Sequence, residues 1–70
     1  MYEYARLLAT DKKIEVCFAR TKKKRTFLGT SDAINELASL GFRMVTYTYG
    51  PDGNGLFCEV YMFERLIKDD

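Results

Sequence analysis

The chain has 70 residues, of which 47% are hydrophobic, 14% aromatic and 30% charged. This composition is typical of one folded globular domain over residues 1–70 and excludes an intrinsically disordered segment. The net charge of +1 is too small for the field expected of a dedicated nucleic-acid-binding protein. Because no apolar run approaches the length of a membrane span and no signal peptide is recognisable, we expect a cytoplasmic protein that does not bind membranes.

The chain contains two cysteines, Cys17 and Cys58, and no histidine. Without a CxxC pair or a histidine, no metal site is expected. In a reducing compartment the cysteines should behave as small core residues, although the sequence leaves a disulfide between them open. Since a domain of this size gains little net stability from its own core, packing and self-association remain the expected stabilising routes.

The first part of the chain predicts a β-hairpin. Residues 2–9 alternate loosely and are rich in aromatic side chains, which favours a strand. After a polar turn, Ile14 and Val16 begin a second alternating segment over residues 14–18, which pairs most simply with the first. The basic segment at 20–25 is then predicted as the exit loop of this hairpin.

One short helix is predicted after Gly29. Thr30 or Ser31 is placed to accept hydrogen bonds from the first free amides, and Asp32 suits the first turn. Gly41 suits the left-handed position that ends a helix. The apolar stripe expected to dock on the sheet consists of Ile34, Leu37, Ala38 and Gly41.

The remaining residues predict a second hairpin, with strands over 42–49 and 56–67 and a glycine-rich turn over 50–55. The expected fold class is therefore α+β, with the order ββαββ. It consists of an antiparallel four-stranded sheet with one short helix on one face.

A single short helix shields only one face of such a sheet, so the other face must be covered in another way. We expect the helix to cover the more apolar side of the last strand, namely Leu56, Cys58, Val60 and Met62. The opposite face would then carry Phe57, Tyr61, Phe63, Tyr47 and Tyr49. Because monomers rarely expose so large an aromatic surface, we expect a homo-oligomer that buries this face or a sheet edge.

Three blocks of the sequence stand out, namely Tyr2-Glu3-Tyr4 in the first strand, residues 34–45 across the helix end, and residues 61–65 in the last strand. Together they resemble a family of small bacterial and phage domains of unknown function. Phe42 stands where that family usually has tryptophan. The resemblance implies a compact helix-on-sheet fold that tends to associate, and it implies no activity.

Residue types that carry catalysis are scarce in this chain. The absence of histidine removes the usual general base and every histidine-activated nucleophile. Glu59 and Glu64 are an odd number of residues apart in one strand, so they should lie on opposite faces and cannot act as an acid–base pair. Glu3 and Glu15, if they face each other across the first hairpin, are expected to be solvated carboxylates. We therefore expect a binding protein without enzymatic activity or a cofactor.

The basic segment offers donors for phosphate groups, flanked by Phe18 and Phe27 as possible stacking rings. Its alternative interpretation is a solvated loop. If it is functional, it encloses a small anion such as a nucleotide against a neighbouring subunit's tyrosines, or it follows a nucleic-acid backbone. The expected ligand-binding residues are Arg20, Lys22, Lys23, Lys24, Arg25, Tyr47, Tyr49 and Tyr61.

The leading hypothesis is a homo-oligomer that sequesters or senses a small anionic ligand, as phage proteins that sequester signalling nucleotides do. The alternative hypothesis is a nucleic-acid-binding or protein-interaction adaptor. Two further interpretations are weaker. The loop at 50–55 is more simply a hairpin turn than an anion-binding nest, and the octapeptide typical of RNA-binding sheets is absent.

Overall fold

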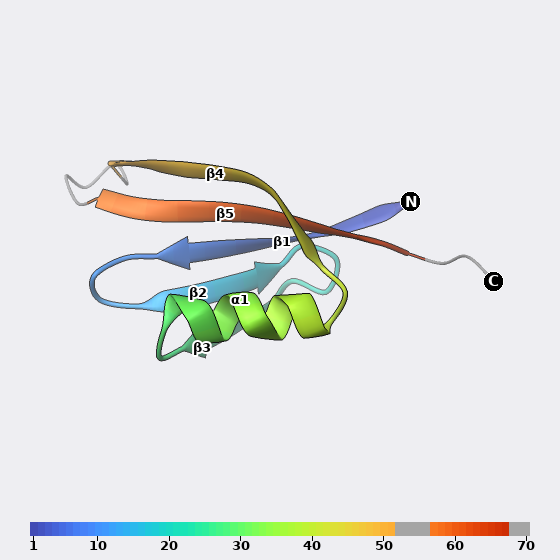
Figure 1. Cartoon of the computed structure of the whole chain (residues 1–70), viewed down its shortest axis with the longest axis horizontal. Helices are drawn as coiled ribbons and strands as arrows, with labels where there is room; N and C mark the ends of the chain where they lie inside the picture. Colours follow the sequence, from blue (N-terminus) through green and yellow to red (C-terminus); the bar gives the residue numbers. More distant parts are fainter. Residues whose placement is uncertain (52–56, 68–70) are drawn as a thin grey trace.

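The structure, a computed structural model, describes residues 1–51 and 57–67. Over these residues it contains one helix and one five-stranded antiparallel sheet, which confirms an α+β fold (Figure 1). The order is βββαββ, so the predicted four strands and the order ββαββ were wrong in detail. Most of the predicted turn at 50–55 lies outside the described residues. The elements are β1 (Tyr2–Ala9), β2 (Ile14–Phe18), β3 (Lys23–Phe27), α1 (Thr30–Ser39), β4 (Arg43–Pro51) and β5 (Phe57–Leu66).

The additional strand is β3, which forms in the segment that was predicted to be a loop. Lys22 adopts a left-handed conformation with a φ of 59°, and its N–H donates to the carbonyl of Phe18, closing a turn that returns the chain along β2. Three cations enter β3, where a strand at the edge of a sheet holds long charged side chains in solvent. Their charge obscured the strand in the sequence, because an edge strand need not show apolar alternation.

The strands lie in the order β3-β2-β1-β5-β4, so β1 is central and β3 and β4 are the two edges. The N-terminal hairpin and the C-terminal hairpin are joined through the antiparallel pairing of β1 with β5. As a result the basic strand and the strand that carries Tyr47 and Tyr49 lie at opposite edges of one sheet.

Helix α1 begins without a side-chain cap. Its N-cap residue is Gly29, whose carbonyl accepts from the N–H of Ala33 at 3.2 Å, so the prediction of Thr30 or Ser31 as the cap was wrong. The extended conformation of Gly29 lets the chain leave β3 and enter the helix directly. Asp32 lies in the first turn, as predicted.

The end of α1 is a Schellman motif, and it confirms the predicted role of Gly41. This glycine has a φ of 91° and its N–H donates to the carbonyl of Ala38 at 3.0 Å. The N–H of Phe42 donates to the carbonyl of Leu37, also at 3.0 Å. Both side chains of this second pair are buried, which provides the hydrophobic contact that accompanies such a motif.

The core lies between α1 and the sheet. The helix contributes Ala33 and Leu37, both fully buried, whereas Ala38 and Gly41 of the predicted stripe are exposed. The buried face of α1 therefore centres on Ala33 and Leu37 instead of including Ala38 and Gly41. From the sheet and the segment after the helix, the core receives Ala5, Leu7, Ala9, Val16, Phe42 and Phe63.

The prediction of which side of β5 faces the helix was inverted. Phe63 is 3% exposed and belongs to the core under α1, with Tyr61 packed against it. Phe63 and Tyr61 are in register with Ala5 and Leu7 of β1, and the small side chain of Ala5 leaves space for a ring beside the helix. Val60 therefore lies on the opposite face, together with Met62.

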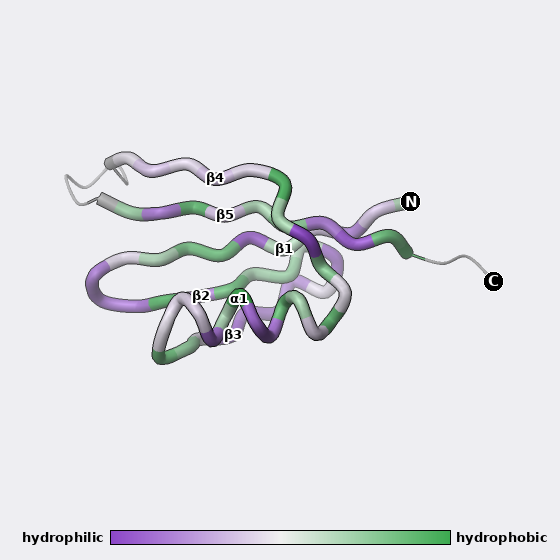
Figure 2. The backbone as a smooth tube through the Cα atoms, in the orientation of Figure 1, coloured by the Kyte–Doolittle hydropathy of each residue, from purple (hydrophilic) through white to green (hydrophobic). Residues whose placement is uncertain are grey.

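The helix covers only part of its own face of the sheet. It contacts β2 and β3, while β4 and β5 extend beyond it (Figure 1). Figure 2 shows that most of β4 is close to neutral in hydropathy, with apolar residues at its start. No helix of the described residues lies over the other face, which we call the helix-free face. Its side chains include Tyr4, Arg6, Leu8, Cys17, Lys24, Val60 and Met62.

Candidate ligand-binding surfaces

The five cations of the basic segment do not form one cluster. Arg20 and Lys22 lie in the turn between β2 and β3, and the other three lie in β3. Lys23 and Arg25 are in register with core-facing residues of β2, so they lie on the helix side, whereas Lys24 is in register with Cys17 on the helix-free face. Strand formation therefore divides the predicted site between two faces.

Arg25 is already neutralised within the chain. Its guanidinium lies 2.6 Å from a carboxylate oxygen of Glu36 on α1 and 5.0 Å from the ring centre of Phe27. The hydrogen bond from Arg25 lowers the pKa of Glu36 below its ordinary value. The hollow beside this pair is also lined by Asp32. Two carboxylates make this hollow a poor site for an anion.

The two rings that were predicted to stack on a ligand pack against the core instead. The ring of Phe18 lies 6.0 Å from that of Phe42, at an angle of 56°. Phe27 is half-buried against the core cluster and lies beneath the guanidinium described above. Neither ring is positioned as an exposed platform for a base.

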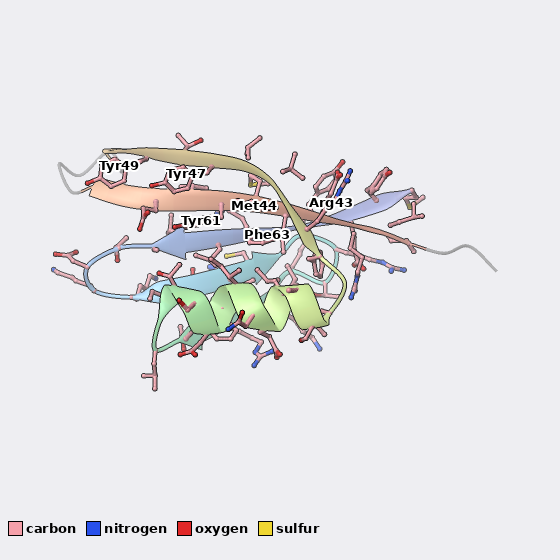
Figure 3. All side chains as sticks on the ribbon, in the orientation of Figure 1. Arg43, Met44, Tyr47, Tyr49, Tyr61 and Phe63 are labelled. Atoms are coloured by element: carbon pink, nitrogen blue, oxygen red, sulfur yellow. The ribbon has the colours of Figure 1, made fainter. Side chains whose placement is uncertain are left out.

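The predicted tyrosines do lie together, at the edge formed by β4 and β5 (Figure 3). The hydroxyls of Tyr47 and Tyr61 both donate to one oxygen of Glu59, at 2.7 and 3.1 Å, and their ring centres are 4.9 Å apart. The hydrogen bond to Glu59 raises the pKa of Tyr47 to about 12, and burial raises the pKa of Tyr61. Tyr49 is in register with Glu59. A carboxylate at the centre of the cluster disfavours an anion there.

The structure does not bring the predicted cations and tyrosines together within one chain. Arg25 and Tyr47 stand at the two ends of one row across the sheet. Since strands are spaced by about 4.8 Å, four spacings separate them by about 19 Å. The row runs Arg25, Val16, Leu7, Tyr61 and Tyr47. A site that combined both groups would require a second chain.

The helix-free face carries a different combination of cations and rings. A hollow is lined by Tyr4, Arg6, Cys17, Ala19 and Met62, together with the backbone of β1. It exists because the small side chains of Cys17 and Ala19 stand between larger ones. A second hollow shares Tyr4 and Ala19, and it is completed by Met1, Tyr2, Glu3, Arg20 and Ile67. Sequence reasoning missed Tyr4 and Arg6, although their alternate positions in the first strand were visible.

Charge on the helix-free face is unbalanced. The two carboxylates that the described strands place on it are paired, Glu15 with Lys13 at 3.5 Å and Glu64 with Arg43 at 2.7 Å. The hydrogen bond from this arginine to Glu64 raises the arginine's pKa. By contrast, three other cations on or beside this face have no carboxylate partner among residues 1–51 and 57–67. These cations are Arg6, Arg20 and Lys24.

The carboxylates do not form an acid–base pair with a neighbour. Glu59 and Glu64 lie on opposite faces of β5, as predicted. Glu3 and Glu15 do not face each other, and each is ion-paired with its side chain only 11% and 14% exposed, respectively, which corrects the expectation of solvated carboxylates. Glu3 is on the helix side and is paired with Arg65. Within the part of the chain that the structure describes, no group of three potential metal ligands occurs.

Both cysteines are free thiols. Strand β1 lies between the strands that carry Cys17 and Cys58, so two strand spacings, about 9.6 Å, separate their backbones. A disulfide requires the two Cα atoms within about 7 Å, which rules out the bridge that the sequence left open. Separately, no helix among the described residues is long and apolar enough to cross a membrane.

Comparison of the chain with protein-family models, with curated protein sequences and with solved structures gives no significant match. The family resemblance described above therefore stays a prediction that rests on its three sequence blocks.

Proposed function

We propose that the chain is a non-enzymatic homo-oligomeric binding protein that holds a small anionic ligand, such as a nucleotide, at an interface between subunits. The observation that supports this most strongly is the helix-free face. It combines uncovered apolar side chains with three cations that have no carboxylate partner in the described residues.

The apolar part of this face favours a second copy of the chain as its cover. Leu8, Val60 and Met62 are half-buried with no layer of the described residues above them, and Tyr4 is 45% exposed. Two sheets pack face to face at about 10 Å when such side chains interdigitate. A two-fold axis would place the same surface on both sides of the contact, as in most homodimers. The resemblance to a family that tends to associate points the same way.

The charged part of this face favours an anion between the two copies. Face-to-face packing brings Arg6, Arg20 and Lys24 of one subunit toward the same residues of the other, where burial strengthens their repulsion. A bound anion removes that repulsion and gains charge-assisted hydrogen bonds. Ligand binding and association should therefore strengthen each other, because the linkage between two equilibria is reciprocal. This coupling suits a protein that sequesters or senses a signalling nucleotide.

The oligomeric state is tested by size-exclusion chromatography with light scattering, with and without a panel of mono-, di- and cyclic nucleotides. We expect a mass above that of the 8.1 kDa chain, increased further by the nucleotide that binds. Val60→Lys places a charge on the helix-free face and should abolish assembly. Tyr49→Lys places the same charge at the β4 edge and serves as the matched control. A monomer under all conditions, or assembly lost only in Tyr49→Lys, would contradict the proposed interface.

Ligand binding is tested by thermal shift with the same panel. A ligand at 100 times its dissociation constant stabilises the folded state by about 2.7 kcal/mol, which is readily visible for a small domain. The variant Arg20→Gln/Lys24→Gln, which changes the two site cations of the basic segment, should weaken the response. Lys12→Gln, in the turn between β1 and β2, should retain it. Equal responses in both variants would remove the basic segment from the site.

A second candidate function is that of a nucleic-acid-binding adaptor. Tyr2 and Tyr4 are both about half exposed and are two residues apart in β1, so they lie on one face as successive stacking positions for a single strand. Contacts from three cations to a single strand predict that the logarithm of the binding constant falls with the logarithm of the salt concentration with a slope of about −2, whereas binding of an enclosed nucleotide should depend less on salt. Titration of oligonucleotides and nucleotides at two salt concentrations separates the two functions. Failure of both to bind favours a protein partner.

A further inference from the structure

We infer that the helix-free face binds a nucleotide through separate contacts to its base and its phosphate, with Tyr4 stacking on the base and Arg6, Arg20 and Lys24 holding the phosphate. This inference rests on the proposed function and specifies its site. It replaces the tyrosines of the β4 edge with Tyr4 as the aromatic contact.

Tyr4 is the ring on this face that is best placed for stacking. Its side chain is 45% exposed, lines both hollows and has no hydrogen-bond or ring partner among residues 1–51 and 57–67. Tyr47 and Tyr61, by contrast, are bound to each other and to Glu59. A ring without a partner offers its face to a base without first breaking an existing contact.

The hollow beside Tyr4 has the chemistry that a base requires. Cys17 and Ala19 provide small apolar side chains where the surface is lowest, and Met62 stands on the β5 side. Flat apolar walls of this kind accept the faces of any base, since stacking does not read the hydrogen-bonding edge. We therefore expect little discrimination between bases.

Arg6 lines the same hollow, and two further cations lie next to residues that line it. Arg6 is two residues from Tyr4 on the same strand face, a separation of about 6.8 Å. Lys24 continues the row beyond Cys17, and Arg20 approaches from the adjacent hollow through the shared Ala19. A guanidinium binds phosphate oxygens through two parallel hydrogen bonds, which makes Arg6 the principal phosphate contact. An inorganic anion would use these cations but would leave the ring unused.

The inference is tested by calorimetric titration of AMP into the wild-type chain and four variants. Loss of stacking in Tyr4→Leu should weaken AMP binding by about 5- to 150-fold, and Tyr4→Phe, which keeps the ring, should retain it. Arg6→Gln should weaken binding by about 10-fold or more. Lys12→Gln is the charge-matched control and should bind AMP like the wild type. Circular dichroism confirms that each variant is folded.

Ribose 5-phosphate, tested as a competitor of AMP, separates the two halves of the site. Arg6→Gln should weaken this competitor, whereas Tyr4→Leu should leave its affinity unchanged because it has no base. If the wild type binds AMP and Tyr4→Leu binds it equally well, the base contact is wrong while the proposed function stands. If neither AMP nor any nucleotide of the panel binds the wild type, both the inference and the proposed anionic nucleotide ligand are overturned.

Discussion

Two glycines, Gly41 at the end of helix α1 and Gly50 in β4, allow the same substitution to be tested with opposite expected signs. Gly41 has a φ of 91°, a left-handed backbone conformation that costs a residue with a side chain about 1–2 kcal/mol. A Cβ built on Gly41 would lie 3.5 Å from Cδ of Arg65, an ordinary contact, so no steric clash adds to this cost. Gly41→Ala should therefore lower the free energy of unfolding by about 1–2 kcal/mol.

Gly50 in β4 provides the matched control. It does not have a positive φ, and a Cβ added there would meet no atom within 4 Å. Alanine restricts the unfolded chain more than glycine does, so Gly50→Ala should stabilise the protein by about 0.4–1 kcal/mol. The two variants carry the same change in composition and differ only in the backbone conformation they must adopt.

The assay is thermal and urea unfolding at one fixed protein concentration, so that association does not alter the comparison. For a domain of this size 1 kcal/mol corresponds to about 4–8 °C, so Gly41→Ala should lower Tm by about 4–16 °C. Gly50→Ala should raise Tm by about 2–8 °C. If both variants lose stability equally, the positive φ of Gly41 does not determine the cost and the Schellman motif is not the reason for this glycine.

Three further predictions concern side chains whose environment the fold creates. Because the folded-state pKa of Glu36 is lowered, its ion pair should stabilise the protein at neutral pH, and this contribution should disappear as the pH falls through and below 4.5. In urea unfolding, Glu36→Gln should reduce the loss of stability at acid pH, and an unchanged loss would count against the ion pair. Because the pKa of Tyr47 is raised to about 12, stability should fall as the pH rises from 10 to about 12. In an ultraviolet titration, Glu59→Gln should abolish the tyrosine ionisation seen near pH 12, and its persistence in the variant would exclude the carboxylate as its cause. Intact-mass labelling with a thiol reagent should find two free cysteines, with half-buried Cys17 modified before Cys58, which is 8% exposed. The reverse order would contradict the deeper burial of Cys58 in the sheet.

Much of the local structure was visible in the sequence because it depends on short-range chemistry. The helix, its glycine stop and the paired hairpin strands follow from periodicity and from the backbone freedom of Gly41. The basic edge strand was missed because solvent on one side of β3 leaves no apolar alternation to detect. The side of β5 that faces the helix was assigned wrongly, because the sequence favoured its aliphatic residues while the space beside Ala5 accommodates the ring of Phe63.

The sequence by itself determined the α+β class, the absence of histidine chemistry and the local concentration of cations. Only the tertiary structure decided which of those cations lie together. Strand alternation sends Lys23 and Lys24 to opposite faces, and the strand order places Tyr47 at the edge farthest from both. Proximity between distant segments depends on register and strand order, which long-range pairing sets and local residue patterns do not encode. For that reason Tyr4 and Arg6 emerged as candidate ligand contacts only from the folded sheet.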